Sequence, residues 1–418
     1  MVNFKAGAGM GNFCFPQEMF PTTEGYTGIH DVPKLRVLVL EWDRIRFVLA
    51  QAELVGLSGC IDACRTMVAG LTGAALENIW ICACHVLETP HMPDRTALKS
   101  ERELQIADLM WKVYERVFAE ACEEAVESLR PAVFGAGYAY SEANVSRILN
   151  TAEGWWHGSD DSGFVDHRIP IYRFDGSDGS PIALLYNFQA QPSVMDGSRL
   201  ADGGRLITAD IAGSASTYIE ERIPGVRAFY LTGAGGDQAP YVQAVRTVLD
   251  RGNQIRRVDI HENGYQLVEL LGERIGQSVV GAAGVLTCSE LEGPVIRRQR
   301  NFLYQGQVIP PTREIRPGRA YTYLPGEPVE TPVEYLRIGG AGLIGIRPEI
   351  CARTLAEIRQ CVGLEVLGLV SFVNGGQKCM PDLTCYDNCA YQAKNSMFAA
   401  GTAEQFAKDI VNMIREQE

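Results

Sequence analysis

The sequence has 418 residues, of which 46% are hydrophobic and 21% charged, an ordinary composition for a globular protein with a large core. The net charge of −13 argues against a basic nucleic-acid-binding surface or a polybasic membrane patch. No apolar run is long enough for a transmembrane helix, and Met1–Pro16 lacks the pattern of a signal peptide. We therefore expect a cytoplasmic protein without nucleic-acid binding or membrane insertion, whose 12 cysteines stay reduced.

Strand and helix patterns alternate through the first part of the chain. Strands are expected at Leu35–Leu40, Ile45–Ala50 and Asn78–Cys84, where β-branched and other apolar residues gather. Helices are expected at Gly59–Leu71 and Ser100–Ser128, the second of which has apolar residues at helical spacing. This alternation is typical of an α/β protein.

The middle and the end of the chain continue the pattern. The segment Tyr140–Gly163 reads as a loop region, and a strong turn signal at Asp175–Gly179 predicts a hairpin of Arg168–Phe174 with Pro181–Phe188. Further helices are expected at Ala209–Glu221, His261–Gly281, Pro348–Cys361 and Thr402–Ile414, and further strands at Ala228–Leu231, Gly342–Ile346 and Val366–Val373.

These elements predict an α/β fold in which a mixed β-sheet core is layered with helices. We expect one domain over residues 1–418, with a β-rich subregion at 285–340 that holds many prolines. Loops of polar residues and glycines follow several strands. In α/β folds such loops at the C-terminal ends of strands assemble the active site.

Three polar residues near strand ends are candidates for chemistry. His85 directly follows Asn78–Cys84 and suits a metal ligand or a general base, although a hydrogen-bonded core histidine is the alternative. Asp237 ends the glycine-rich loop Gly233–Asp237, which either approaches a ligand or forms a plain tight turn. Glu349 opens an expected helix, where the helix dipole alone favours an acidic residue.

The cysteines offer a second kind of site. Cys379, Cys385 and Cys389 lie close together in the sequence after a strand, as thiolate metal ligands or a redox pair would. The sequence contains no Cys-x-x-Cys motif, which excludes a zinc ribbon. The pairs at positions 60 and 64 and at positions 82 and 84 fit core packing.

Several short motifs occur in a common order along the chain. The most informative of these motifs are Ile81–His85, Tyr186–Pro192, Leu206–Gly213, Leu231–Pro240 and Pro348–Glu349. Their order and spacing resemble the neutral/alkaline ceramidase family, in particular its short bacterial members without the C-terminal immunoglobulin-like domain. The resemblance covers most of the chain.

The resemblance implies a zinc-dependent hydrolase. In that family, zinc held by two histidines, a glutamate and a tyrosine activates water or a serine for amide hydrolysis. His85 matches the first histidine, Glu349 matches the glutamate, and Cys379 falls near the tyrosine. Arg147 and Tyr391 match residues that contact the substrate or the oxyanion.

Three positions depart from the family pattern. Leu87 stands in place of the second histidine of the His-x-His motif, Gln191 in place of the histidine before a proline, and Ala239 in place of the nucleophilic serine. A glutamine amide is a weak zinc ligand, whereas a cysteine thiolate is a strong one. Direct attack by a metal-bound water would not require the serine.

The residue roles implied by the resemblance follow from these matches. The metal ligands are His85, Glu349 and Cys379, and His91 is a candidate for a fourth. The catalytic residues are Arg147, Tyr391 and Asp237. The substrate-binding residues are Gln191, Gly235 and Gly236. Trp156 is added from the sequence itself, because the loop Trp155–His157 either lines an apolar substrate pocket or forms an aromatic cluster at the surface.

Three functions fit these residues. The first is a divergent metal-dependent hydrolase, with zinc as cofactor, that acts on an amide-type bond of a small molecule. The second is a non-catalytic binding or regulatory protein on the same scaffold, and the third is a rewired enzyme that uses the Cys379 thiol. For the hydrolase, the expected partner is a small-molecule substrate. The sequence also allows assembly into a homo-oligomer.

Overall fold

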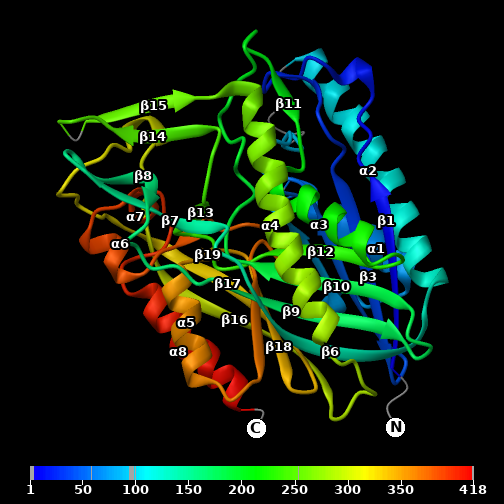
Figure 1. Ribbon diagram of the computed structural model, residues 1–418. Helices are drawn as coiled ribbons and strands as arrows, with labels where there is room; N and C mark the ends of the chain where they lie inside the picture. Colours follow the sequence, from blue (N-terminus) through cyan, green and yellow to red (C-terminus); the bar gives the residue numbers. More distant parts are fainter. Residues whose placement is uncertain (1–3, 58, 94–97, 99, 253, 417–418) are drawn as a thin grey trace.

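The computed structural model describes residues 4–57, 59–93, 98, 100–252 and 254–416, and its core is a large mixed sheet (Figure 1). This eight-stranded sheet has the order β12-β10-β9-β6-β1-β3-β4-β5. Its strands in chain order are β1 (Lys5–Asn12), β3 (Lys34–Trp42), β4 (Ile45–Ala52), β5 (Ile79–Ala83), β6 (Arg130–Tyr140), β9 (Arg168–Gly176), β10 (Pro181–Phe188) and β12 (Arg227–Thr232).

A second sheet packs against one face of the first. Its strands, in the order β16-β17-β18-β20, are β16 (Val295–Gln307), β17 (Pro325–Ile338), β18 (Ala341–Ile346) and β20 (Val366–Val370). Leu38 and Leu185 of the large sheet meet Leu336 and Leu343 of the second sheet in one buried cluster. The two sheets therefore enclose the central core, as in a β-sandwich.

Helices cover the outer face of the large sheet. They are α1 (Ile61–Thr72), α2 (Glu101–Glu127), α3 (Asp210–Arg222) and α4 (Gly264–Val285). Alternate glycines of β1 let α2 lie directly on that strand, because a Cβ on Gly9 would come within 2.2 Å of the Ala121 carbonyl oxygen. A capping box at Ser100 and Glu103 begins α2.

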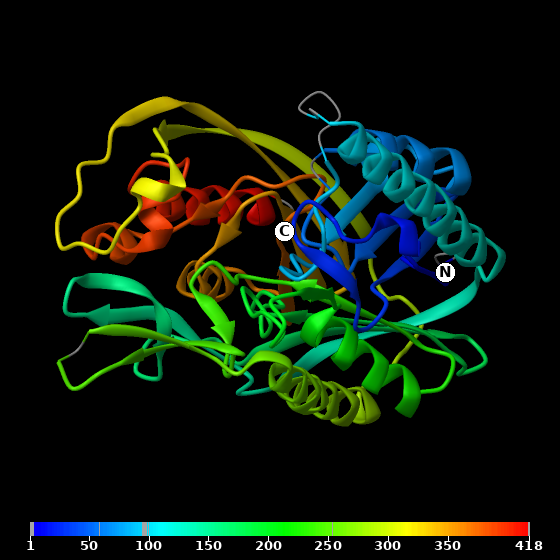
Figure 2. The ribbon, with the colours of Figure 1, turned by 90° about the horizontal axis from the view of Figure 1, so that it is seen from above.

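Two helices cover the outer face of the second sheet, so the molecule has four layers of helix, sheet, sheet and helix. They are α5 (Ala352–Cys361) and α8 (Thr402–Arg415). Phe406 and Ile410 of α8 pack with Tyr304 of β16 and Tyr335 of β17. Figure 2 shows the yellow β16–β17 ribbon passing above the red C-terminal helix.

Three short sheets contribute residues to the candidate site. The first holds β13 (Gln238–Pro240), β7 (Asn144–Thr151) and β8 (Gly154–Asp160), the second β14 (Val245–Leu249) and β15 (Ile255–Asp259), and the third β19 (Glu349–Ile350) and β21 (Cys379–Met380). A fourth short sheet, of β2 (Tyr26–Ile29) and β11 (Arg205–Ile207), does not line that site. Two short helices, α6 (Leu383–Asp387) and α7 (Tyr391–Lys394), follow β21.

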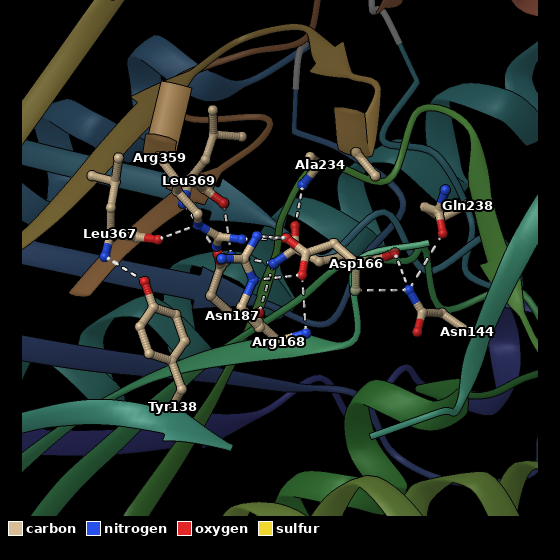
Figure 3. Close-up of polar contacts among 12 residues, drawn as sticks. Tyr138, Asn144, Asp166, Arg168, Asn187, Ala234, Gln238, Arg359, Leu367 and Leu369 are labelled. Carbon is tan, nitrogen blue, oxygen red and sulfur yellow. Dashed lines mark hydrogen bonds and ion pairs between the residues drawn. The ribbon is translucent and has the colours of Figure 1, made fainter. Parts of the chain in front are cut away.

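A buried polar network links the sheets near this end (Figure 3). Arg359 of α5 forms an ion pair with Asp166, and both side chains are only 4% exposed. Arg168 also donates to Asp166, from Nε to Oδ1 at 2.9 Å. Asn187 of β10 bonds both the carbonyl and the amide of Leu369, at 2.7 and 3.0 Å. A side chain of the large sheet thus satisfies backbone groups of β20.

The α/β fold expected from the sequence is confirmed, with local differences. The segment Tyr140–Gly163, expected to be a loop region, contains the paired strands β7 and β8. The helix expected from Pro348 begins instead at Ala352, because Glu349 and Ile350 pair with β21. No helix in the described part of the chain is long and apolar enough to cross a lipid bilayer.

Candidate functional site

A cavity of about 640 Å³ opens among the short sheets, within the size range of small-molecule sites. The residues that line it come from segments far apart in the sequence. They include His85, Leu87, Arg147, Trp156, His157, Gln191, Asp196, Ala239, Arg257, Glu349, Phe372, Lys378, Cys379 and Tyr391. Seven of the ten predicted site residues therefore lie on one cavity, and the exceptions are Asp237, Gly235 and Gly236.

His85 and Glu349 form the centre of this cavity. The His85 Nδ1 atom lies 3.7 Å from Glu349 Oε2, and the two side chains are 24% and 5% exposed. Among the described residues, His85 Nδ1 and Glu349 Oε1 have no hydrogen-bond partner. Two buried ligand-type atoms are therefore free for a ligand that faces the cavity.

The backbone around His85 is strained. His85, Phe372 and Lys378 have φ angles of 60°, 61° and 59°, in the left-handed region that side chains other than glycine rarely adopt. All three residues line the cavity, and the ring centroids of His85 and Phe372 are 4.4 Å apart. Such strain gathers at functional sites, where it fixes the direction of side chains.

Opposing effects set the charge of Glu349. Burial raises its pKa, but the charges of His85 and Arg147 and the hydrogen bond from Gln191 outweigh burial, so the pKa lies below its ordinary value. Gln191 donates from Nε2 to Glu349 Oε2 at 2.5 Å. The Glu349 carboxylate is therefore held in its ionised form, ready to accept from a donor or to bind a cation.

Arg147 is fixed on the cavity wall by backbone groups. Its Nε and Nη2 atoms donate to the Gly236 carbonyl oxygen at 3.1 and 2.9 Å, and Nη1 donates to Gln191 Oε1 at 3.4 Å. Its backbone amide donates to the Asp237 carbonyl oxygen at 2.9 Å. The guanidinium is thus oriented before any substrate arrives, as oxyanion or carboxylate recognition requires.

Three rings form the aromatic side of the cavity. The ring of Tyr391 lies 5.3 Å from Trp156 and 4.1 Å from His157, measured between centroids. Burial, aided by the charge of Arg147, lowers the pKa of His157 to about 3, so this imidazole stays neutral at physiological pH. Burial raises the pKa of Tyr391, and its hydroxyl accepts from Asn395 Nδ2 at 3.2 Å.

Asp237 and the two glycines lie behind the cavity wall. Asp237 Oδ1 accepts the backbone N–H of Ala352, the first residue of α5, at 2.8 Å. Burial raises the pKa of Asp237 well above its usual range. A Cβ on Gly236 would lie 2.7 Å from Cys379 Sγ, whereas one on Gly235 would meet nothing nearer than 3.4 Å. Only Gly236 is thus placed where a side chain would disturb the site.

The expected metal ligands are only partly gathered. Cys379 pairs with Glu349 across the parallel β19–β21 bridge and lines the cavity. His91 instead bonds Glu24 at 2.9 Å in an exposed pair. Among the described residues, the three ligand atoms that lie within 4.8 Å of one another belong to Cys351, Asp382 and Cys385.

Sequence reasoning missed several charged residues of the cavity. Asp196, Arg257 and Lys378 all line it. Arg257 lies on β15, an element not expected from the sequence. Lys378 directly precedes Cys379, so the glycine-rich loop after β20 was the one signal that could have drawn attention to it. With Arg147, the cavity carries three basic side chains, against the carboxyl groups of Glu349 and Asp196.

Solved structures of bacterial and related enzymes share this fold. The neutral ceramidase of Pseudomonas aeruginosa superimposes with a TM-score of 0.74 at 16% identity, over 99% of this chain and 74% of that one. A ceramidase complexed with C2 gives a TM-score of 0.72 at 15% identity, over 100% of this chain and 76% of that one. No protein-family profile and no protein of curated function matches the sequence. The chain therefore has a ceramidase-like fold.

Proposed function

We propose that this chain is a zinc-dependent hydrolase that cleaves an amide-type bond of a small anionic substrate. The observation that carries the proposal is the pair of buried, unpartnered atoms His85 Nδ1 and Glu349 Oε1 on one cavity. The ceramidase-like fold adds support, because the neighbours of the same fold are named ceramidases, and ceramide is itself an amide.

The donor atoms fit zinc. Two ligands bonded at about 2.0–2.1 Å to a tetrahedral zinc lie roughly 3.3 Å apart. The 3.7 Å between His85 Nδ1 and Glu349 Oε2 shows that the imidazole and the carboxylate stand close to that separation. The carboxylate would turn its other oxygen, Oε1, to the metal, because Oε2 accepts from Gln191. Cys379 on the neighbouring strand is the proposed third ligand. Zinc bound there would supply Lewis-acid activation of water at neutral pH.

Arg147 is the proposed oxyanion and carboxylate contact. Its guanidinium is already fixed by Gly236 and Gln191, so little reorganisation is needed when negative charge develops on a substrate carbonyl. Tyr391 adds a protonated hydroxyl on the aromatic side of the cavity. In the overall reaction, a water oxygen bonds to the carbonyl carbon, the carbon–nitrogen bond breaks, and a water proton passes to the departing amine.

The charge of the cavity supports an anionic substrate. Arg147, Arg257 and Lys378 can pair with a carboxylate at a distance from the scissile bond. A long uncharged lipid would offer these side chains no charged partner. We therefore propose N-acyl amino acids, rather than ceramide, as the substrate class.

A binding protein on the same scaffold is the second candidate. Leu87 and Ala239 both line the cavity, where neither can move a proton or act as a nucleophile. The third candidate, a thiol enzyme, is less well supported. Contact with Cys351 and burial both raise the pKa of the Cys379 thiol well above its usual range, which opposes formation of a nucleophilic thiolate.

The test is an amidase assay joined to metal analysis. The zinc-loaded protein is assayed against N-acyl amino acids and against matched N-acyl amines that lack the carboxylate. We expect amine release from the first set, lost on addition of a chelator and in Glu349→Gln, and reduced at least about tenfold in Arg147→Met. Tight binding of the first set without turnover would support the binding protein and reject the hydrolase.

A further inference from the structure

A compact cluster of ligand atoms lies outside the centre of the cavity. The thiols of Cys351 and Cys385 and a carboxylate oxygen of Asp382 lie within 4.8 Å of one another. All three residues are buried, with exposures of 0%, 2% and 8%. They come from two segments, since Cys351 precedes α5, whereas Asp382 and Cys385 belong to the start of α6.

The sulfur–sulfur distance matches a metal site better than a disulfide. Cys351 Sγ and Cys385 Sγ are 3.8 Å apart. Two thiolates bonded at about 2.3 Å to a tetrahedral zinc lie roughly 3.8 Å apart. A disulfide needs about 2.05 Å. The two sulfur atoms thus already stand at the separation of neighbouring zinc ligands.

Core packing does not explain the cluster, because it includes carboxylates. Asp382 Oδ1 accepts the Cys385 backbone N–H at 3.1 Å, which leaves its second oxygen available. Asp237 approaches from the loop after β12, held by the Ala352 N–H next to Cys351. In the described part of the chain, no lysine or arginine forms an ion pair with either carboxyl group. Burial raises the pKa of both groups, and a bound divalent ion would favour their ionised form.

We propose that Cys351, Cys385 and Asp382 bind a structural zinc ion, whose fourth ligand is a water or, after a side-chain movement, Asp237. Thiolates favour zinc over magnesium or calcium. The site uses other ligands than the zinc proposed for the cavity, although the Cys351 thiol contacts that of Cys379.

This ion would tie together the two segments that build the cavity wall. Cys351 lies two residues after Glu349, and Asp382 lies three residues after Cys379. The β19–β21 pair between them has only two residues in each strand. A zinc ion behind it would hold Glu349 and Cys379 in place, as the metal of a structural zinc site holds short segments that cannot pack on their own.

The test is metal content measured by mass spectrometry on the full-length chain purified from zinc-supplemented medium. We expect one zinc per chain to be lost in Cys351→Ser and in Cys385→Ser. Cys122→Ser, which changes a cysteine buried in α2, is the matched control and keeps the full zinc content. His85→Ala removes only the zinc of the cavity, so failure of the proposed function is distinguished from failure of the structural site.

Cobalt substitution gives an independent readout. Cobalt bound by two thiolates produces an intense sulfur-to-metal charge-transfer band, which we expect to persist in His85→Ala and to disappear when Cys351→Ser is added to His85→Ala. Where the serine variants do not fold, Asp382→Asn keeps both thiols, and we expect its zinc affinity to fall at least about tenfold. In the wild-type protein, chelation should lower the melting temperature.

Three results would overturn the proposal. The first is a full zinc content in both serine variants. The second is a folded wild-type protein that holds no zinc after purification from zinc-supplemented medium and whose melting temperature ignores both zinc and chelator. The third is a Cys351–Cys385 disulfide in non-reduced peptide maps of the freshly purified protein.

Discussion

Gln191 shows how a single side chain changes the chemistry of the cavity. Its amide donates to Glu349 Oε2 and accepts from Arg147, so it links the acid to the cation. An imidazole in its place would offer a lone pair to a metal. The neutral amide instead donates to one oxygen of the carboxylate and would weaken a metal site there.

Gln191→His should therefore strengthen zinc binding in the cavity. The change adds an imidazole ligand beside His85 and Glu349 and removes the amide donor. We expect the zinc affinity of the cavity site to rise at least about tenfold, measured by competition with a coloured chelator. Gln243→His changes another residue of the cavity lining and is the control. Equal affinity in the Gln191→His and wild-type proteins would contradict the assignment.

His157 is expected to remain neutral far below the ordinary pKa of a histidine. Its pKa is about 3 in the folded protein, lowered by burial and by Arg147, against about 6.5 in an unfolded chain. Between these values the unfolded chain binds a proton that the folded protein does not, so stability falls as the pH falls from 6.5 towards 3. Histidine-selective NMR should show a neutral ring at pH 5.

The variant His157→Phe checks the consequence for stability. It should lose less free energy of unfolding than the wild-type protein when the pH falls from 7 to 5, as measured by urea unfolding at both values. An equal loss in the two proteins would show that His157 does not resist protonation.

At the scale of elements, the cavity depends on the contact between the loop after β12 and the β19–β21 pair. Gly236 donates its backbone N–H to Ile350 at 3.0 Å, and its carbonyl oxygen receives the Arg147 guanidinium. The sequence predicted that this glycine-rich loop would approach the site. It did not indicate the partner strand, because a two-residue bridge between Glu349 and Cys379 has no periodic pattern.

Gly236→Ala should disturb both stability and the cavity. The added Cβ would lie 2.7 Å from Cys379 Sγ and 3.0 Å from the Ile350 carbonyl oxygen. Overpacking of this kind costs about 1–3 kcal/mol of the free energy of unfolding, measured by urea denaturation. Gly235→Ala is the matched control, because its Cβ meets nothing nearer than 3.4 Å. Equal stability of the two variants would refute the close contact at Gly236.

At the scale of the whole molecule, the two sheets and their helices form the frame that brings distant loops together. A run of apolar residues predicted the strand around Leu38, the turn signal at Asp175–Gly179 predicted the strand around Leu185, and apolar residues at helical spacing predicted the helix from Ser100. The hairpin of β7 and β8 was missed, since Trp155 and Trp156 stand between glycines and read as a loop. In the structure β7 pairs with β8 on one side and with β13 on the other, and no local sequence pattern predicts the pairing with β13.

The ion pair between Arg359 and Asp166 should be a main support of that frame. Asp166→Ala leaves the Arg359 guanidinium buried without its acid, and removal of one partner of a buried pair costs about 3–5 kcal/mol of the free energy of unfolding. Arg168→Ala removes the other, more exposed partner of Asp166 and should cost less than about 1 kcal/mol. Urea unfolding of the two variants compares them, and similar losses would contradict this ranking.

The central claim is that the cavity binds zinc at His85 and Glu349, and anomalous diffraction at the zinc absorption edge tests it most directly. Crystals of the wild-type protein grown with zinc should show an anomalous peak bonded to His85 Nδ1 and Glu349. The peak should be absent in crystals of Glu349→Gln grown in the same way. An empty His85–Glu349 site in zinc-saturated wild-type crystals would contradict the account.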